Sequence, residues 1–167
     1  KKPSACNAAE TLLVHERVAK GFYPQIIPVL QATGVKVYGD AFLTGLFPDV
    51  VQPATEENYR TEYLDLALSV KTVSSLDDAI AHIRTYGSRH SEVIVTEDPA
   101  SAARFMNEID SAVLLWNAST RFNDGGEFGF GCEIGISTDK LHARGPMGLP
   151  ELTSYKYQVT GTGQVRG

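Results

Sequence analysis

Apolar runs typical of strands alternate with amphipathic segments typical of helices through the middle of the sequence. The runs are rich in Val, Ile and Leu, whereas the segments between them place apolar residues three to four positions apart. The expected strands are 66–73, 92–96 and 111–116, and the expected helices are 75–86 and 98–109. Strands joined by such helical crossovers run parallel. The sequence therefore predicts an α/β fold with a mostly parallel sheet and helices on both of its faces.

The first third of the chain continues this alternation. Residues 11–15 and 35–38 predict strands, and residues 16–32 between them carry apolar side chains at helical spacing, with Gly34 as the C-cap. Pro24 and Pro28 predict a break in that helix, because proline removes a backbone hydrogen bond. Further along, residues 42–47 predict one helical turn, after which two prolines interrupt regular structure.

The last third of the chain has a different amino-acid composition. Residues 122–148 are rich in glycine and poor in helix formers, which predicts a long loop region. Residues 152–165 alternate around Tyr155, Tyr157 and Val159, which predicts a strand or hairpin with little core of its own. Such a strand pairs with another chain or with another part of the same protein.

Charge and cysteine content narrow the class of protein. The net charge of -5 attracts neither nucleic acid nor an anionic membrane surface, and no apolar run approaches the ~20 residues of a membrane span. Two cysteines, Cys6 and Cys132, form no disulfide framework and fit a reducing, cytoplasmic location. The four histidines lack metal-ligand spacing, so no metal site is predicted.

Cys6 is the candidate nucleophile. A short turn of helix is expected over residues 6–10, and a thiol at a helix N-terminus has a lowered pKa. The backbone N–H groups of such a turn also stabilise an oxyanion on an attacked carbonyl. A buried structural cysteine is the alternative that spacing alone leaves open. Cys132, within a glycine-rich loop, is interpreted as incidental.

Polar residues follow the last expected strand of the sheet. Asn117, Ser119 and Arg121 come directly after residues 111–116, and ligands bind at the carboxyl ends of strands in open α/β sheets. The guanidinium fork of Arg121 suits a carboxylate or a phosphate. A surface arginine on a turn is the alternative. The glycine pairs at 129–131 and 161–163 are interpreted as plain turns.

Four long motifs resemble the γ-glutamyl phosphate reductase family of the aldehyde dehydrogenase superfamily. They are PSACNAAETLLVH at 3–15, AIAHIRTYGSRHSEVI at 79–94, WNASTRF at 116–122 and EIGISTDKLHARGP at 133–146. The match covers nearly the whole chain. The resemblance implies an aldehyde-dehydrogenase-type catalytic domain, also found as the reductase half of bifunctional pyrroline-5-carboxylate synthases.

The resemblance implies NADPH-dependent reduction of L-glutamyl 5-phosphate to L-glutamate 5-semialdehyde, with release of phosphate, in proline biosynthesis. Cys6 would attack the acyl phosphate and form a thioester, with its own backbone N–H as one oxyanion donor. Glu62 would contact the nicotinamide ribose of NADPH. Asn117, Ser119 and Arg121 would bind the substrate.

The resemblance also implies an organisation. A catalytic domain would span 1–117, a loop-rich return segment toward the cofactor domain 118–150, and an oligomerisation strand or hairpin 151–167. Family members are much longer, so we expect this chain to be a piece of a longer polypeptide that lacks the N-terminal cofactor domain and is inactive alone. The intact enzyme would be a homo-oligomer, with glutamate 5-kinase, separate or fused, as its pathway partner.

Two other functions are kept open. One is a cysteine acyltransferase or hydrolase that pairs Cys6 with a histidine, although no triad spacing favours it. The other is a non-catalytic domain that assembles through residues 152–165. Reactivity of the Cys6 thiol distinguishes the enzymes from the assembly domain.

Overall fold

Four parallel strands form the larger of two sheets in the structure, a computed structural model that describes residues 2–167. Their order across the sheet is β1-β4-β2-β3, and each neighbouring pair is parallel. The strands are β1 (Thr11–His15), β2 (Lys36–Gly39), β3 (Val51–Pro53) and β4 (Ala67–Val73). The three strands expected in this part of the chain are confirmed to within two residues, and β3 is an addition.

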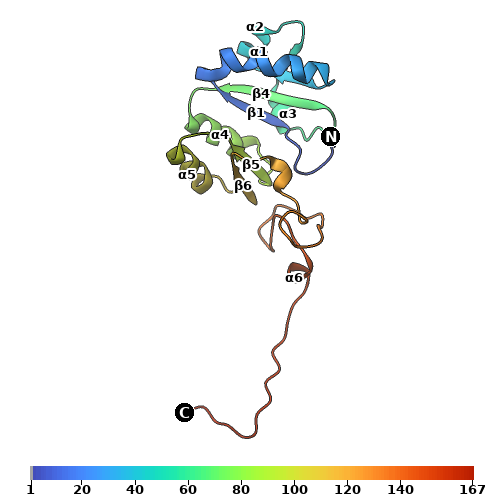
Figure 1. Cartoon of the computed structure of the whole chain (residues 1–167), viewed down its shortest axis with the longest axis vertical. Helices are drawn as coiled ribbons and strands as arrows, with labels where there is room; N and C mark the ends of the chain where they lie inside the picture. The colour runs from blue at the N-terminus through green and yellow to red at the C-terminus, as the bar shows by residue number, and fades with distance from the viewer. Residues whose placement is uncertain (1) are drawn as a thin grey trace.

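Helix α1 (Glu16–Ala32) covers one face of this sheet as a single continuous helix (Figure 1). The predicted break at Pro24 and Pro28 is therefore wrong. Both prolines are exposed, so water can hydrate the carbonyl groups that they leave without an intrahelical donor. The face toward the sheet is fully buried at Ala19, Tyr23 and Ile27.

The end of α1 confirms Gly34 in its capping role. Gly34 adopts a φ of 78°, and its N–H donates to the carbonyl of Gln31 at 3.0 Å. The N–H of Val35 donates to the carbonyl of Leu30 at 2.9 Å, which completes a Schellman motif. The left-handed backbone at Gly34 thus turns the chain directly from α1 into β2.

Two short helices flank the edge strand of this sheet. Asp40 caps α2 (Ala41–Leu46) and also accepts a hydrogen bond from the backbone N–H of Thr72 at 2.5 Å, which joins the carboxyl ends of β2 and β4. Helix α3 (Glu56–Arg60) and strand β3 were not predicted, because elements this short show no periodicity. Pro53 is compatible with β3 because that strand lies at the sheet edge.

A second, two-stranded parallel sheet lies on the other side of the first, with its own helices (Figure 1). Its elements are α4 (Leu76–Tyr86), β5 (Ser91–Ile94), α5 (Pro99–Glu108) and β6 (Val113–Trp116). Ile80, Phe105 and Ile109 form its small core. The expected α/β alternation is confirmed, but the parallel strands divide into two sheets. Runs of Val, Ile and Leu such as those of β5 and β6 predict strands buried on both faces, but this prediction is wrong here because both strands are only half-buried.

Beyond β6 the chain has little regular structure. A 3₁₀ turn (Thr120–Phe122) leads into irregular loops, which Lys140 and Arg144 tether to the carboxylate of Asp110. Helix α6 (Leu149–Leu152) is a single turn. The loop region expected at 122–148 is thereby confirmed.

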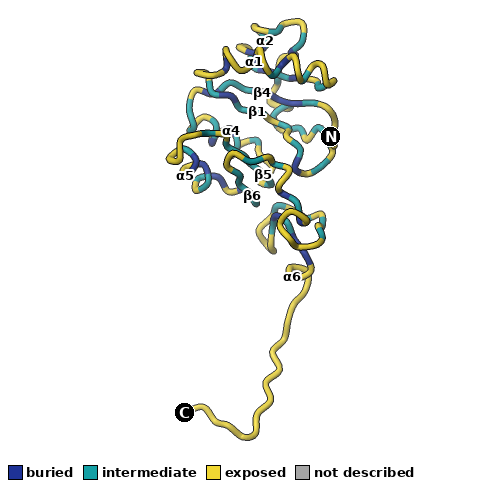
Figure 2. The backbone as a smooth tube through the Cα atoms, in the orientation of Figure 1, coloured by how far each residue is buried: buried dark blue, intermediate teal, exposed yellow. Residues whose placement is uncertain are grey.

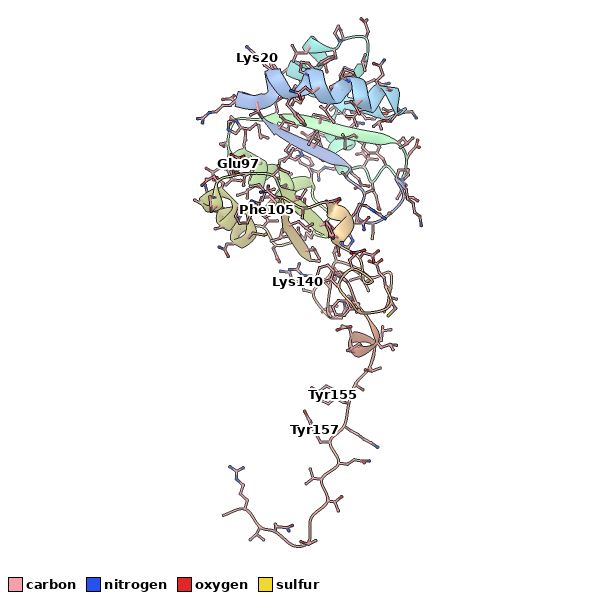
Figure 3. All side chains as sticks on the ribbon, viewed as in Figure 1. Lys20, Glu97, Phe105, Lys140, Tyr155 and Tyr157 are labelled. Atoms are coloured by element: carbon pink, nitrogen blue, oxygen red, sulfur yellow. The ribbon has the colours of Figure 1, made fainter. Side chains whose placement is uncertain are left out.

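The last residues extend away from the rest of the chain without pairing (Figures 1 and 2). Tyr155 and Tyr157 are 84% and 83% exposed, and no strand forms at 152–165 (Figure 3). The predicted strand is therefore absent from the single chain, because a strand needs hydrogen-bond partners that residues 2–167 do not offer it. Among those residues, no helix is both long and apolar enough to cross a membrane.

Candidate active site

Cys6 lies in an irregular segment that precedes β1. Two turns shape it: the N–H of Ala5 donates to the carbonyl of Lys2 at 3.1 Å, and the N–H of Ala8 donates to that of Ala5 at 2.9 Å. No helix begins at Cys6, so the expected helical turn over residues 6–10 is wrong. The four residues between Cys6 and the first residue of β1 leave too little chain for a helix before the extended strand.

The environment of the Cys6 thiol raises its pKa above the ordinary value. Partial burial is the main cause, and the carboxylate of Glu133 adds to it. The backbone N–H of Cys6 and the guanidinium of Arg121 act in the opposite direction. The expectation of a thiol activated by a helix dipole therefore fails here. The backbone N–H of Cys6 and, after it, the cation of Arg121 favour the thiolate, but burial and Glu133 outweigh them.

Asn7 brings Cys6 and Arg121 together. Its side-chain oxygen accepts a hydrogen bond from Nη1 of Arg121, and its Nδ2 donates to the carbonyl of Asn123 at 3.0 Å. The hydroxyl of Thr120 donates to the backbone carbonyl of Asn7 at 2.7 Å. The segment of Cys6 is thus bound to the 3₁₀ turn after β6, at the carboxyl end of the smaller sheet.

Two buried asparagines in this site were missed from the sequence. Asn7 is 4% exposed and Asn123 is fully buried, and Nδ2 of Asn123 donates to the hydroxyl of Ser91 at 2.6 Å. Asn7 directly follows the candidate nucleophile and Asn123 directly follows the WNASTRF motif. Proximity to those motifs was the only available signal.

The other two residues predicted to bind the substrate, Ser119 and Asn117, form hydrogen bonds with backbone groups of the protein. The hydroxyl of Ser119 accepts from the N–H of Arg121 at 3.2 Å and so shapes the turn that carries the guanidinium. Both amide atoms of Asn117 bind the backbone of Thr96, at 2.9 Å each. Asn117, with a φ of 51°, therefore joins the ends of β5 and β6 and has no unpartnered amide atom.

Glu62 lies exposed in the loop after α3 and near two other ionisable groups of the site. Its carboxylate raises the pKa of Glu10, second to burial, and it acts on the imidazole of His90. Burial, opposed by Glu133 and Glu62, lowers the pKa of His90. Carboxylate oxygens accept hydrogen bonds from ribose hydroxyls, so Glu62 fits the sugar of a nicotinamide cofactor. Among residues 2–167, no glycine-rich turn opens a helix to hold its pyrophosphate.

Two shallow hollows mark the surface. The smaller, about 160 Å³, is lined by Arg121, Phe122 and Glu127 and adjoins the Cys6 segment through Arg121. The larger, about 520 Å³, lies at the opposite end of β1 and is lined by Glu16, Arg17, Lys20, Phe42 and Thr72. Among residues 2–167, no group of three His, Cys, Asp or Glu side chains could hold a metal ion.

The chain is similar along its length to known reductases. It is 60% identical over 166 residues to γ-glutamyl phosphate reductase of Carboxydothermus hydrogenoformans, covering 99% of this chain and 40% of the relative. It is 59% identical over 163 residues to that of Thermobifida fusca, covering 98% of this chain and 39% of the relative. No model of a known protein family matches the chain.

Comparison with solved structures points to the same enzymes. The crystal structure of γ-glutamyl phosphate reductase from Thermotoga maritima matches with a TM-score of 0.91 and 53% identity, over 100% of this chain and 40% of that one. An acetylating aldehyde dehydrogenase from Geobacillus thermoglucosidasius shares the fold, with a TM-score of 0.62 and 12% identity over 96% of this chain and 46% of that one. By sequence and by fold the chain is similar to γ-glutamyl phosphate reductases, and it spans about 40% of the length of the relatives that it matches.

Proposed function

We propose that this chain supplies the nucleophile and the substrate-binding groups of an enzyme that reduces L-glutamyl 5-phosphate to L-glutamate 5-semialdehyde, with release of phosphate, in proline biosynthesis. The observation that carries the proposal is the contact of Arg121 with Asn7, which sets an anion-binding side chain beside Cys6. The similarity to γ-glutamyl phosphate reductases supports the choice of substrate.

Cys6 attacks the acyl carbon of the substrate. A bond forms between its sulfur and that carbon, the bond to the phosphate oxygen breaks, and inorganic phosphate leaves. The product on the protein is a thioester, and the backbone N–H of Cys6 donates to the oxyanion that develops on the way. Because the pKa of the thiol is raised, this step should become faster as the pH rises toward that pKa.

Arg121 and Ser119 hold the substrate in this proposal. The guanidinium of Arg121 binds a carboxylate or the phosphate through two N–H groups, and Ser119 orients the turn that carries it. Asn117, first expected to contact the substrate, acts through Thr96 by fixing the strand ends from which this turn starts. The 160 Å³ hollow beside Arg121 is the place where part of the substrate enters.

NADPH is the proposed cofactor, and when bound it would supply a hydride for reduction of the thioester. The carboxylate of Glu62 would accept hydrogen bonds from its ribose hydroxyls. The remaining features also stay proposals: a cytoplasmic homo-oligomer assembled through residues 151–167, a return segment at 118–150 after the catalytic domain at 1–117, and glutamate 5-kinase as pathway partner.

The acylation step is testable with this chain alone. Acetyl phosphate serves as the acyl phosphate probe, and intact mass together with inorganic phosphate release gives the result. Wild type and Cys132→Ser should both form one acetyl thioester and release phosphate, whereas Cys6→Ser should form none. Equal labelling of both cysteines, or none above free cysteine, would contradict the proposal and favour the non-catalytic assembly domain.

The reduction is tested in a chimera in which residues 2–167 replace the matching part of the Thermotoga maritima relative. Glutamate 5-semialdehyde, phosphate and NADP⁺ should give NADPH in the reverse direction, and Cys6→Ser should abolish it. Arg121→Ala should raise KM for phosphate or for L-glutamyl 5-phosphate steeply, and an unchanged KM for both would refute its role. Thioester hydrolysis without NADPH would indicate the acyltransferase or hydrolase alternative.

A further inference from the structure

Both polar atoms of the Asn7 side chain form hydrogen bonds with residues more than a hundred positions away. Nδ2 donates to the carbonyl of Asn123 at 3.0 Å, and Oδ1 accepts from Nη1 of Arg121. The backbone carbonyl of Asn7 accepts from the hydroxyl of Thr120 at 2.7 Å. Because Asn7 is only 4% exposed, water does not easily replace these hydrogen bonds.

The rest of the segment has only local support. Within the described residues, the other hydrogen bonds of positions 2–9 are the two turns at Ala5 and Ala8. Asn123 extends the network by donating to the hydroxyl of Ser91, at the start of β5. The connection from the Cys6 segment to the smaller sheet therefore passes through Asn7.

We propose that Asn7 is a positioning residue that holds the guanidinium of Arg121 beside the thiol of Cys6. The inference rests on the proposed function, in which Cys6 is the nucleophile and Arg121 binds the anionic substrate. Arg121 is exposed and its side chain is long and flexible, so an acceptor is needed to fix it in one place. Asn7 supplies that acceptor from the residue next to the nucleophile.

The chemistry of position 7 favours asparagine specifically. Oδ1 must accept from Arg121 while Nδ2 donates to the carbonyl of Asn123. An aspartate would accept but could not donate, and it would set two oxygens against each other in a buried place. An alanine would leave Arg121 without its acceptor and the carbonyl of Asn123 without a donor.

Loss of this contact should change the thiol in a measurable way. Arg121 is a cation that favours the thiolate of Cys6, against burial and Glu133. If the guanidinium is released into solvent, the pKa of Cys6 should rise. Because only the thiolate reacts, a higher pKa lowers the fraction of thiolate and therefore the alkylation rate at pH 7.

The test is a double-mutant cycle read from the pH profile of iodoacetamide alkylation. The whole chain is used in a Cys132→Ser background, so that Cys6 is its one thiol, with Asn7→Ala, Arg121→Ala and the double variant. Each single variant should raise the pKa of Cys6 by a similar amount, and the double variant by no more than Arg121→Ala alone. Asn107→Ala, an exposed site on α5, is the matched control and should leave the profile unchanged.

Additive shifts in the double variant would overturn the inference, since Asn7 would then act independently of Arg121. An unchanged profile in a folded Asn7→Ala variant would overturn it too. If circular dichroism shows that Asn7→Ala does not fold, Asn7→Ser takes its place in the cycle with the same criteria. Acylation of Cys6 by acetyl phosphate together with additive shifts would reject the inference alone, whereas a non-additive cycle without acylation would reject the proposed function alone.

Discussion

Glu92→Gln is expected to stabilise the chain at pH 8 and to change its stability little at pH 4.5. Glu92 lies on β5, where burial raises the pKa of its carboxyl group from 4.5 to about 7. Ser111 offsets this only weakly, with its hydroxyl 3.4 Å from Oε1. Among the described residues no cation acts on the carboxylate, so its ionisation in the folded chain is uncompensated.

The magnitude follows from that pKa. Raising a carboxyl pKa from 4.5 to about 7 corresponds to about 3 kcal/mol, at about 1.4 kcal/mol for each tenfold change in the equilibrium. Because the folded pKa lies above the unfolded one, the stability contributed by Glu92 is complete below pH 4.5 and lost as the pH rises to about 7. Glutamine does not titrate, so the variant avoids this loss.

Urea unfolding between pH 4.5 and 8 measures the effect, with the fluorescence of Trp116, at the end of β6, as the signal. The variant should gain up to about 3 kcal/mol on wild type as the pH rises through this range. Glu97→Gln is the matched control, because Glu97 is an exposed carboxylate that follows the same strand (Figure 3). A stability difference between Glu92→Gln and wild type that does not depend on pH would refute the reasoning.

Two further predictions concern the buried histidine of α4 and two glycines in and after α1. His82 is 5% exposed with no partner for Nε2 in the described structure, and burial lowers its pKa from 6.5 to about 4. The free energy of unfolding should therefore fall as the pH drops from 6.5 to 4. In urea unfolding, His82→Phe should remove this loss. A variant as sensitive to acid as wild type would contradict the prediction. Gly34→Ala should destabilise the chain by about 1 kcal/mol because of the φ of 78° at Gly34. Gly21→Ala inside α1 should instead stabilise it by about 0.5–1 kcal/mol. Shifts of the same sign in the thermal unfolding temperature would refute the role of Gly34 as the cap of α1.

Elements with a repeating local pattern were predictable from the sequence. Helices α4 and α5 begin where Ser75 and Asp98 cap them, and their apolar residues recur at helical spacing. The break expected in α1 failed because exposure decides whether a proline is tolerated, and exposure is a property of the packed chain. The strand expected at 152–165 does not form within the described chain, because pairing requires a partner that this chain does not provide.

Some residues of the candidate site were likewise predictable from the sequence, and others were not. Cys6 and Arg121 could be named from the sequence, because their side chains carry recognisable chemistry within distinctive motifs. The helix expected at Cys6 was wrong, and the buried amides of Asn7 and Asn123 were missed. Asparagine is common in turns, so nothing local separates a buried bridging amide from a surface one.

The sequence by itself determined the α/β alternation, the resemblance to γ-glutamyl phosphate reductases and the residue types available for chemistry, since these depend on local spacing and on motifs within single segments. Only the tertiary structure decided that the segment of Cys6 is bound to the turn of Arg121, that partial burial raises the pKa of the Cys6 thiol although Arg121 opposes it, and that the parallel strands form two sheets. These outcomes depend on contacts between residues more than a hundred positions apart or between separate layers. Such contacts are set by the burial of whole helices and strands, which local propensity does not encode.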